Sequence, residues 1–245
     1  MRRIVLKLDY IGSAYCGWQR QIGVDSVQSR VEEALLRLTG ENITVTASGR
    51  TDAGVHALGQ IIHFDTNSNI PVKNFMTGLN HFLPNDIRVL QTKKVSEKFH
   101  ARFSAKEKTY CYVMYESEVD KSVYFNRAVR IKGKLDVKKM NEAAVAFLGE
   151  HDFTSYMSTG ADTVGAVRTI KELKVVRRDG LVKIYVTANG FLYNMVRLIA
   201  GSLIRAGKGE LSASDITALI EKKSKDAVRE VMPAHGLYLV NVKYK

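Results

Sequence analysis

The chain has 245 residues, enough for one large domain or two small ones, and its composition of 45% hydrophobic and 25% charged residues is that of a globular protein with a buried core. A formal net charge of +12, from 37 Lys and Arg against 25 Asp and Glu, favours a polyanionic partner such as nucleic acid over an evenly basic surface. The two cysteines are widely spaced, which argues against a zinc finger. The start of the chain is too charged for a signal peptide, and no apolar run approaches the ~20 residues of a membrane span. We therefore expect a cytoplasmic protein.

Residues 1–104 are predicted to form a first half. Alternating apolar residues at 4–10 predict a strand, and Asp25-Ser26-Val27-Gln28 resembles a capping box that opens a helix. A second helix is expected after Pro71, a residue suited to the first helical turn. Further strands are predicted at 43–47, 60–65 and 87–95. The resulting order, β-α-β-β-α-β, is that of a ferredoxin-like unit.

Residues 105–245 are predicted to repeat this pattern with additions. Asp136 is a candidate helix cap, and Asp179-Gly180 is a strong hairpin signal. The expected strands are 108–116, a weaker one at 124–131, 167–177, 181–188 and 237–244, and the later helices are 191–205 and 216–220. We therefore expect an α+β fold of two ferredoxin-like halves whose sheets join side by side, with helices on one face and a cleft between the halves. Such junctions are common ligand sites.

The most informative stretch is Ser-Gly-Arg-Thr-Asp-Ala-Gly-Val-His-Ala at 48–57. It connects two expected strands and is longer than a tight hairpin needs, and loops on rigid sheets tend to carry functional groups. Arg50 and Asp52 stand between two glycines and are candidate functional residues. The pattern equally allows a structural role, in which Asp52 caps backbone amides and Arg50 faces solvent.

Two other stretches combine charge with aromatic or apolar residues. Arg102, Lys106 and Lys108 lead into a strand with Tyr110, and such side chains contact phosphates and stack on unpaired bases. Ordinary packing of strand tyrosines is the commoner alternative. Arg197 interrupts an apolar helix, where it either pairs with a carboxylate or extends toward solvent.

The remaining candidates carry less weight. A further basic set forms either a second binding strip or a solvated strand face, and the second interpretation is slightly favoured. Its members are Lys171, Lys174, Arg177 and Arg178. The six histidines show no metal-ligand spacing, so no metal is expected, and no cofactor site is evident.

Taken together, these stretches resemble the TruA family of tRNA pseudouridine synthases over nearly the whole chain. The segment 49–57 resembles the family's catalytic motif and is highly specific. The other motifs follow in the family's order: Tyr15-Cys16-Gly17-Trp18-Gln19, Leu83-Pro84, Phe99-His100-Ala101-Arg102-Phe103-Ser104-Ala105, Lys108-Thr109-Tyr110, His151-Asp152-Phe153, Val167-Arg168-Thr169-Ile170, Phe191-Leu192-Tyr193-Asn194-Met195-Val196-Arg197 and Pro233-Ala234-His235-Gly236-Leu237. Cys16, where an aromatic residue is more usual, and Met232 depart from the pattern outside the catalytic set.

The resemblance implies that the chain isomerises uridine to pseudouridine at positions 38, 39 and 40 of the tRNA anticodon stem-loop. It implies a homodimer across which the tRNA lies. Asp52 would be the nucleophile in the cleft between the halves. Arg197 would be its partner, with a charge-assisted contact of about 2.7–2.9 Å.

The other roles follow from the need to take a paired base out of its stack. Arg50 would fill the gap that the flipped uridine leaves, because a guanidinium stacks well. Tyr110 would stack on the flipped uracil, which is a safer expectation than proton abstraction by a tyrosine with a pKa near about 10. The basic residues Arg102, Lys106 and Lys108 would contact phosphates.

Two other classes of protein compete with this interpretation. A non-catalytic RNA-binding protein or tRNA folding chaperone could share the fold, although such a protein has no need of Asp52, Tyr110 and Arg197 together. A nuclease would usually need metal-binding carboxylates, which the sequence lacks, and a nucleoside hydrolase would release free uracil.

Overall fold

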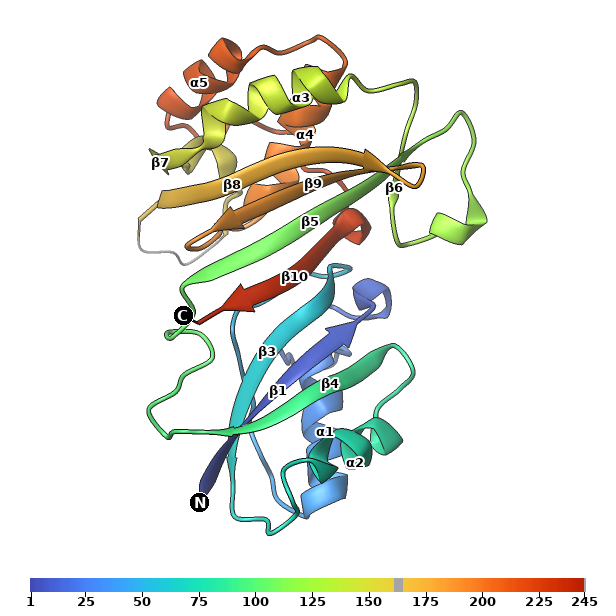
Figure 1. The fold of residues 1–245 in the computed structure, drawn as a ribbon, viewed down its shortest axis with the longest axis vertical. Helices are drawn as coiled ribbons and strands as arrows, with labels where there is room; N and C mark the ends of the chain where they lie inside the picture. Colours follow the sequence, from blue (N-terminus) through green and yellow to red (C-terminus); the bar gives the residue numbers. More distant parts are fainter. Residues whose placement is uncertain (161–164, 245) are drawn as a thin grey trace. The chain divides into compact units, whose positions relative to one another are not determined.

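The computed structural model describes residues 1–160 and 165–244 and belongs to the α+β class (Figure 1). The chain forms two compact units. One consists of residues 1–106 with the last segment from Tyr238, and the other consists of residues 107–237. The sequence-based division after residue 104 assigned that last segment to the second half. Within the described ranges, no helix is long and apolar enough to cross a membrane.

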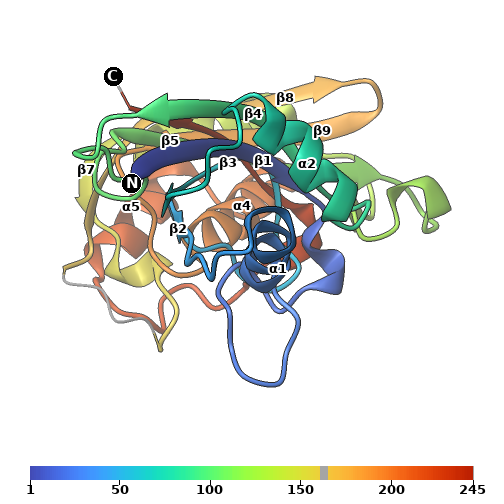
Figure 2. The same cartoon turned by 90° about the horizontal axis from the view of Figure 1, so that it is seen from below.

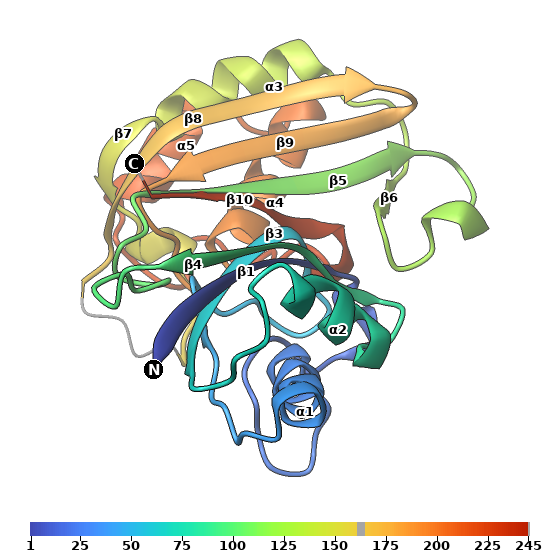
Figure 3. The same cartoon turned by 60° about the horizontal axis from the view of Figure 1, so that its bottom comes forward.

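The first unit is an open sheet with two helices. Its elements are β1 (Arg2–Tyr10), α1 (Val27–Thr39), β2 (Thr46–Ala47), β3 (His56–Thr66), α2 (Asn74–Phe82), β4 (Ile87–Val95) and β10 (Leu237–Lys243). The strand order is β4-β1-β3-β10, with β2 paired to β3. The contacts of β3 with β1 and β2 are antiparallel, whereas β10 runs parallel to it. Both helices lie on the same side of β1 and β4 (Figure 3).

Local sequence explains these elements. Ile4, Leu6 and Leu8 are fully buried on one face of β1, as the alternating pattern predicts. A capping box does open α1, but one residue later than the predicted Asp25–Gln28: the Ser26 side chain accepts from the backbone N–H of Ser29, whose side chain accepts from the Ser26 N–H. The strand predicted at 43–47 is shorter in the structure, where β2 contains two residues.

The second unit is also a sheet with helices. Its elements are β5 (Glu107–Glu116), β6 (Val129–Ile131), α3 (Val137–Ala144), β7 (Gly149–Asp152), β8 (Val167–Arg178), β9 (Leu181–Ala188), α4 (Met195–Gly207) and α5 (Ala213–Glu221). The strand order is β5-β9-β8-β7, and β6 pairs in parallel with β5. Figure 2 shows α4 on one side of β5 and β9, and α3 packs against α4 and β8.

Several local predictions are confirmed in this unit, and others need correction. Asp136 caps α3 by accepting from two backbone N–H groups. Asp179 and Gly180 both have left-handed φ angles, 53° and 73°, as a tight hairpin turn requires. The helix expected from 191 begins only at Met195, because Asn194 has a φ of 60°. The strand expected at 124–131 is reduced to β6, since a 3-10 turn occupies Ser122–Tyr124.

The observed order of elements in the first unit is the predicted β-α-β-β-α-β, followed by the returning β10. The interpretation of the whole chain as two ferredoxin-like halves, with sheets side by side and a cleft between them, stays a prediction.

Candidate active site

Asp52 lies in the loop that connects β2 to β3 in the first unit. The loop's anchor is Thr51, which is 5% exposed, whereas Asp52 is half-buried and Arg50 is exposed. The Thr51 hydroxyl hydrogen-bonds the buried hydroxyl of Tyr10 at 2.8 Å, and its carbonyl accepts from the N–H of Trp18 at 2.9 Å. Because Thr51 is fixed inward by these two hydrogen bonds, the backbone that carries its two charged neighbours is held in place.

The root of this loop is fixed by a buried glutamine. Ser48 donates its backbone N–H to the carbonyl of Ile61 at 2.7 Å and its hydroxyl to Oε1 of Gln60 at 2.6 Å. Gln60 is fully buried, and its Nε2 donates to the carbonyl of Gly49 at 2.8 Å. Buried amides of this kind are costly unless satisfied, so Gln60 specifies one path for the chain that leads to Arg50.

Two glycines allow the segment after β1 to pack closely against the loop. A Cβ on Gly12 would lie 1.9 Å from the carbonyl oxygen of Val55. Gly17 has a φ of +89°, and its Cβ would lie 2.7 Å from the carbonyl oxygen of Thr51. The Gly12 N–H also donates to Nδ1 of His56 at 3.0 Å. Gly17 belongs to the sequence motif at residues 15–19, but its role in supporting the loop is visible only in the structure.

Replacing Gly17 by alanine is expected to lower the free energy of unfolding by about 2 to 4 kcal/mol, from left-handed strain and overpacking against Thr51 together. Gly23 is the matched control, because its φ of +79° is similar and nothing lies within 4 Å of its added Cβ. Gly23→Ala should cost only about 1 kcal/mol of strain. Urea denaturation measures both values, and equal losses would contradict close packing at Gly17.

Tyr110 lies on β5 in the second unit and is 8% exposed. Its ring meets the ring of Phe191 edge-on, with centroids 5.0 Å apart at 83°. Tyr110 and Tyr112 are two residues apart, so their side chains share one face of the strand. The tyrosine therefore has the packing expected of a core residue, but it is held by an aromatic partner in a defined orientation.

Arg197 occupies the first turn of α4. Eleven of the 13 residues in this helix are buried, and the two arginines, Arg197 and Arg205, are the exceptions. Arg197 is half-buried, and its guanidinium donates to Oδ1 of Asn194 at 2.7 Å and to the carbonyl of Met232 at 2.5 Å. The side chain is therefore not simply extended into solvent. Its predicted contact with Asp52, which belongs to the other unit, stays a prediction.

The turn at 232–236 brings Arg197 and the β5 tyrosines into one neighbourhood. The Tyr112 hydroxyl donates to the carbonyl of Pro233 at 2.8 Å, and a Cβ on Gly236 would lie 2.8 Å from Cζ of Tyr112. Burial raises the pKa of Tyr112, and the Arg197 guanidinium opposes that shift in part. Arg197 therefore lies near the face of β5 that also carries Tyr110.

The predicted phosphate-binding residues are divided between the units. Arg102 and Lys106 are exposed in the first unit, and the Arg102 guanidinium lies 5.7 Å from the ring centroid of Phe103. Lys108 is half-buried on β5 in the second unit. The positions of these three side chains do not show whether they contact phosphates, so their phosphate-binding roles stay predictions.

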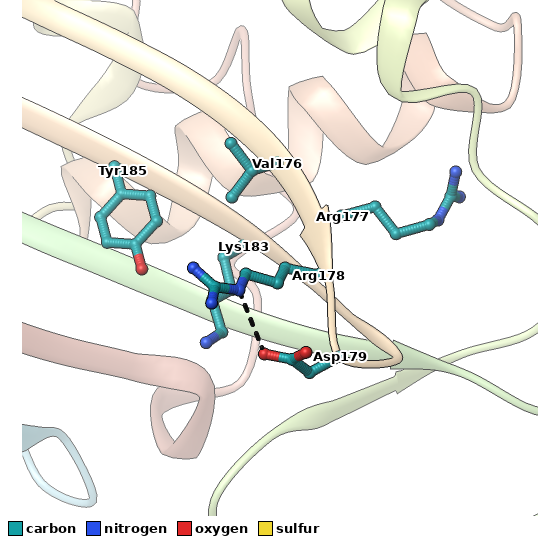
Figure 4. A pocket seen from close by; sticks show the side chains of 6 residues that line it. All are labelled: Val176, Arg177, Arg178, Asp179, Lys183 and Tyr185. Atoms are coloured by element: carbon teal, nitrogen blue, oxygen red, sulfur yellow. Dashed lines mark ion pairs between the residues drawn. The ribbon is translucent and has the colours of Figure 1, made fainter.

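The second basic set lies mainly in ion pairs. Lys171 pairs with Glu107 at 2.6 Å, and Arg177 pairs with Glu116 at 2.6 Å. A hollow of about 470 Å³ at the end of the β8–β9 hairpin contains the Arg178–Asp179 pair, whose atoms are 3.4 Å apart (Figure 4). None of the predicted catalytic residues lines this hollow. These pairs agree with the interpretation of a solvated strand face.

Comparisons with known proteins agree with the sequence motifs. The family model described as "tRNA pseudouridine synthase" matches residues 8–104 and 143–245. A protein of Acetivibrio thermocellus named "tRNA pseudouridine synthase A" is 42% identical over 244 residues and is aligned over 100% of both chains. Proteins of the same name from Ruminiclostridium cellulolyticum and Photobacterium profundum are each 43% identical, covering 100% and 99% of this chain and 100% and 93% of theirs. The chain therefore belongs to the tRNA pseudouridine synthase family, which isomerises uridine to pseudouridine in tRNA.

Proposed function

We propose that this enzyme isomerises uridines 38, 39 and 40 in the anticodon stem-loop of tRNA, with Asp52 as the nucleophile. The observation that carries the proposal is the support of the Asp52 loop. The half-buried Asp52 directly follows a buried threonine whose hydroxyl and carbonyl are hydrogen-bonded to Tyr10 and Trp18, and an exposed arginine precedes that threonine. A catalytic group must be positioned closely to be effective, and a purely structural loop has no need of such support beneath a charged residue.

The reaction conserves all atoms of the nucleotide. The N1–C1′ bond breaks and its electron pair leaves with the uracil, while the Asp52 carboxylate attacks C1′ or C6 or stabilises positive charge at C1′, as glycosidase carboxylates do. The base then turns, C5 bonds to C1′, the proton on C5 is lost and N1 gains a proton. No oxidant and no transferred group is required.

Arg197 supports the ionised state of Asp52 in this proposal. A guanidinium favours and orients a neighbouring carboxylate, and the two hydrogen bonds of Arg197 to Asn194 and Met232 restrict its own rotation. Arg50, which is exposed and two residues from Asp52, stacks into the gap left by the flipped uridine.

Tyr110 stacks on the flipped uracil in this proposal, and its hydroxyl is not required as a base. We expect Tyr110→Phe to keep the single-turnover rate within about tenfold of wild type, whereas Tyr110→Leu loses about 100-fold, since a stacked base contributes about 1–3 kcal/mol. Tyr193→Phe serves as the control, because Tyr193 is 41% exposed in the same unit. A Tyr110→Phe variant as slow as Tyr110→Leu would instead assign proton abstraction to the hydroxyl.

We also propose that the enzyme acts in the cytoplasm, where its tRNA substrate is found, as a homodimer. The resemblance to its family supports the dimer, and sedimentation of the purified chain measures it directly. A monomer at assay concentrations that retains full activity would refute the need for a second subunit.

The test of the reaction uses an unmodified tRNA transcript with uridines in the anticodon arm, incubated without added metal or cofactor. Pseudouridine is mapped at single-nucleotide resolution for the wild type. Confinement to positions 38–40 is the expected result, and modification elsewhere in the tRNA would refute the assigned positions. Tight binding without pseudouridine would favour the RNA-binding or chaperone alternative, which family membership does not favour, and free uracil would indicate a hydrolase.

A further inference from the structure

The segment after β4 carries an aromatic side chain that the proposed mechanism does not use. Phe103 is 76% exposed, although phenylalanine is usually buried. Its ring stacks on the ring of His100, with centroids 4.3 Å apart at 28°, and the Arg102 guanidinium lies 5.7 Å from its centroid. An exposed ring beside a cation is the combination that proteins use to bind unpaired nucleobases.

The turn that presents Phe103 is internally bonded. His100 donates its N–H to the Ser104 hydroxyl at 3.0 Å, and its carbonyl accepts from the Ser104 N–H at 2.9 Å. Nδ1 of His100 accepts from the N–H groups of Arg102 and Phe103, each at 3.2 Å. Four hydrogen bonds within five residues fix the backbone of the turn around Phe103. The exposure of its ring therefore follows from the conformation of the turn.

The same turn is anchored to the sheet at the fully buried Ala101. Its N–H donates to Nδ1 of His63 at 3.2 Å, and its carbonyl accepts from the Tyr244 hydroxyl at 2.8 Å. Burial, with the nearby Arg3 and His100, lowers the pKa of His63 to about 4. His63 therefore stays neutral near pH 7 and remains able to accept this hydrogen bond.

The anchor connects the turn to the strands that hold the Asp52 loop. His63 on β3 is the register partner of Thr46 on β2, and the loop begins directly after β2. The Tyr244 hydroxyl interacts also with the side chain of Ser48 at the root of that loop. Within the first unit, the turn that carries the exposed ring and the loop that carries the candidate nucleophile are therefore joined to the same pair of strands.

We infer that His100, Arg102 and Phe103 form a stacking platform for an unpaired base of the substrate RNA. This inference rests on the proposed function for the identity of the RNA. Phe103 supplies the exposed ring, and His100 supports its position. Arg102 contacts either the phosphate next to the stacked base or the π-face of that base. A stacked base adds sequence-tolerant affinity, which suits an enzyme proposed to modify neighbouring positions in one stem-loop.

The platform is tested by the equilibrium binding of unmodified tRNA transcript to full-length variants at several salt concentrations. Phe103→Leu is expected to raise the Kd about tenfold with an unchanged salt slope, because stacking releases no counterions. Phe103→Trp should restore the Kd to within about twofold. Arg102→Gln should reduce the slope by about 0.7 to 0.9 if it contacts a phosphate.

Phe125→Leu is the matched control, because Phe125 is exposed to the same degree, 75%, in the second unit. Equal Kd values for the Phe103→Leu, Phe125→Leu and wild-type proteins would overturn the platform. A change in sedimentation mass without a change in Kd would assign the ring to self-association and would also overturn it. Binding is measured apart from turnover, so a failure to form pseudouridine would affect the proposed reaction without deciding the platform.

Discussion

Asp52→Asn is expected to reduce single-turnover pseudouridine formation by about 10⁴-fold or more while the tRNA Kd stays within about threefold. The amide is nearly isosteric with the carboxylate and preserves the loop, but it is not a competent nucleophile and cannot stabilise developing positive charge. A rate that falls on substitution while the Kd is retained is the signature of an interaction made only in the reaction's transition state. Single-turnover assays and filter binding with the same transcript provide the two quantities.

The control for this substitution removes a negative charge elsewhere. Asp136→Asn makes the same chemical change at the N-cap of α3, a position where asparagine caps about as well as aspartate. Its rate should equal that of wild type. A rate for Asp52→Asn within tenfold of wild type would leave Asp52 as a structural loop residue and would assign the nucleophile elsewhere.

Arg197→Lys is expected to lower the single-turnover rate by about 100-fold and to move the acidic limb of the pH–rate profile to higher pH. A lysine keeps the charge but loses the planar fork that pairs with a carboxylate and with two fixed acceptors. A carboxylate with weaker cationic support is protonated more readily as the pH falls. The pH shift separates support of Asp52 from a general loss of folding.

Two variants test this explanation of Arg197. Arg205→Lys changes an arginine of the same helix that pairs with Glu210 at 3.2 Å on the surface, and it should leave both the rate and the pH profile unchanged. Tyr112→Phe removes a different side-chain bond to the 232–236 turn, the one to Pro233, while keeping the cation. If Tyr112→Phe reproduced the pH shift of Arg197→Lys, Arg197 would act by holding the turn and not by supporting Asp52.

Local sequence signals predicted the elements well wherever one residue type satisfies a backbone requirement. The cap at Asp136 and the turn at Asp179-Gly180 were predicted because their side chains or φ angles are settled within a few residues. The capping box before α1 was expected on Asp25–Gln28 and lies one residue later, on Ser26–Ser29. The larger errors occurred where apolar periodicity was the main signal. The helix expected from 191 starts four residues later, because Asn194 adopts a left-handed conformation that periodicity does not reveal.

The candidate site was partly predictable for the same reason. The motif around Asp52 and the isolated arginine in an apolar helix identify residues whose chemistry is unusual for their setting. The supporting residues have no such signature, since Tyr10, Thr51 and Gln60 are ordinary in composition. Their role depends on partners 11 to 41 positions away, a separation at which sequence patterns carry no pairing information.

The sequence by itself determined the α+β class, most of the strands and helices, the family and the identity of the candidate nucleophile, because these depend on local backbone preferences and on ordered motifs. Only the tertiary structure decided how the Asp52 loop is held, where Arg197 finds its acceptors and why Phe103 stays exposed. Those features arise from buried hydrogen bonds and close backbone contacts between distant segments. Such contacts are specified by the packing of the whole unit, not by any one stretch of chain.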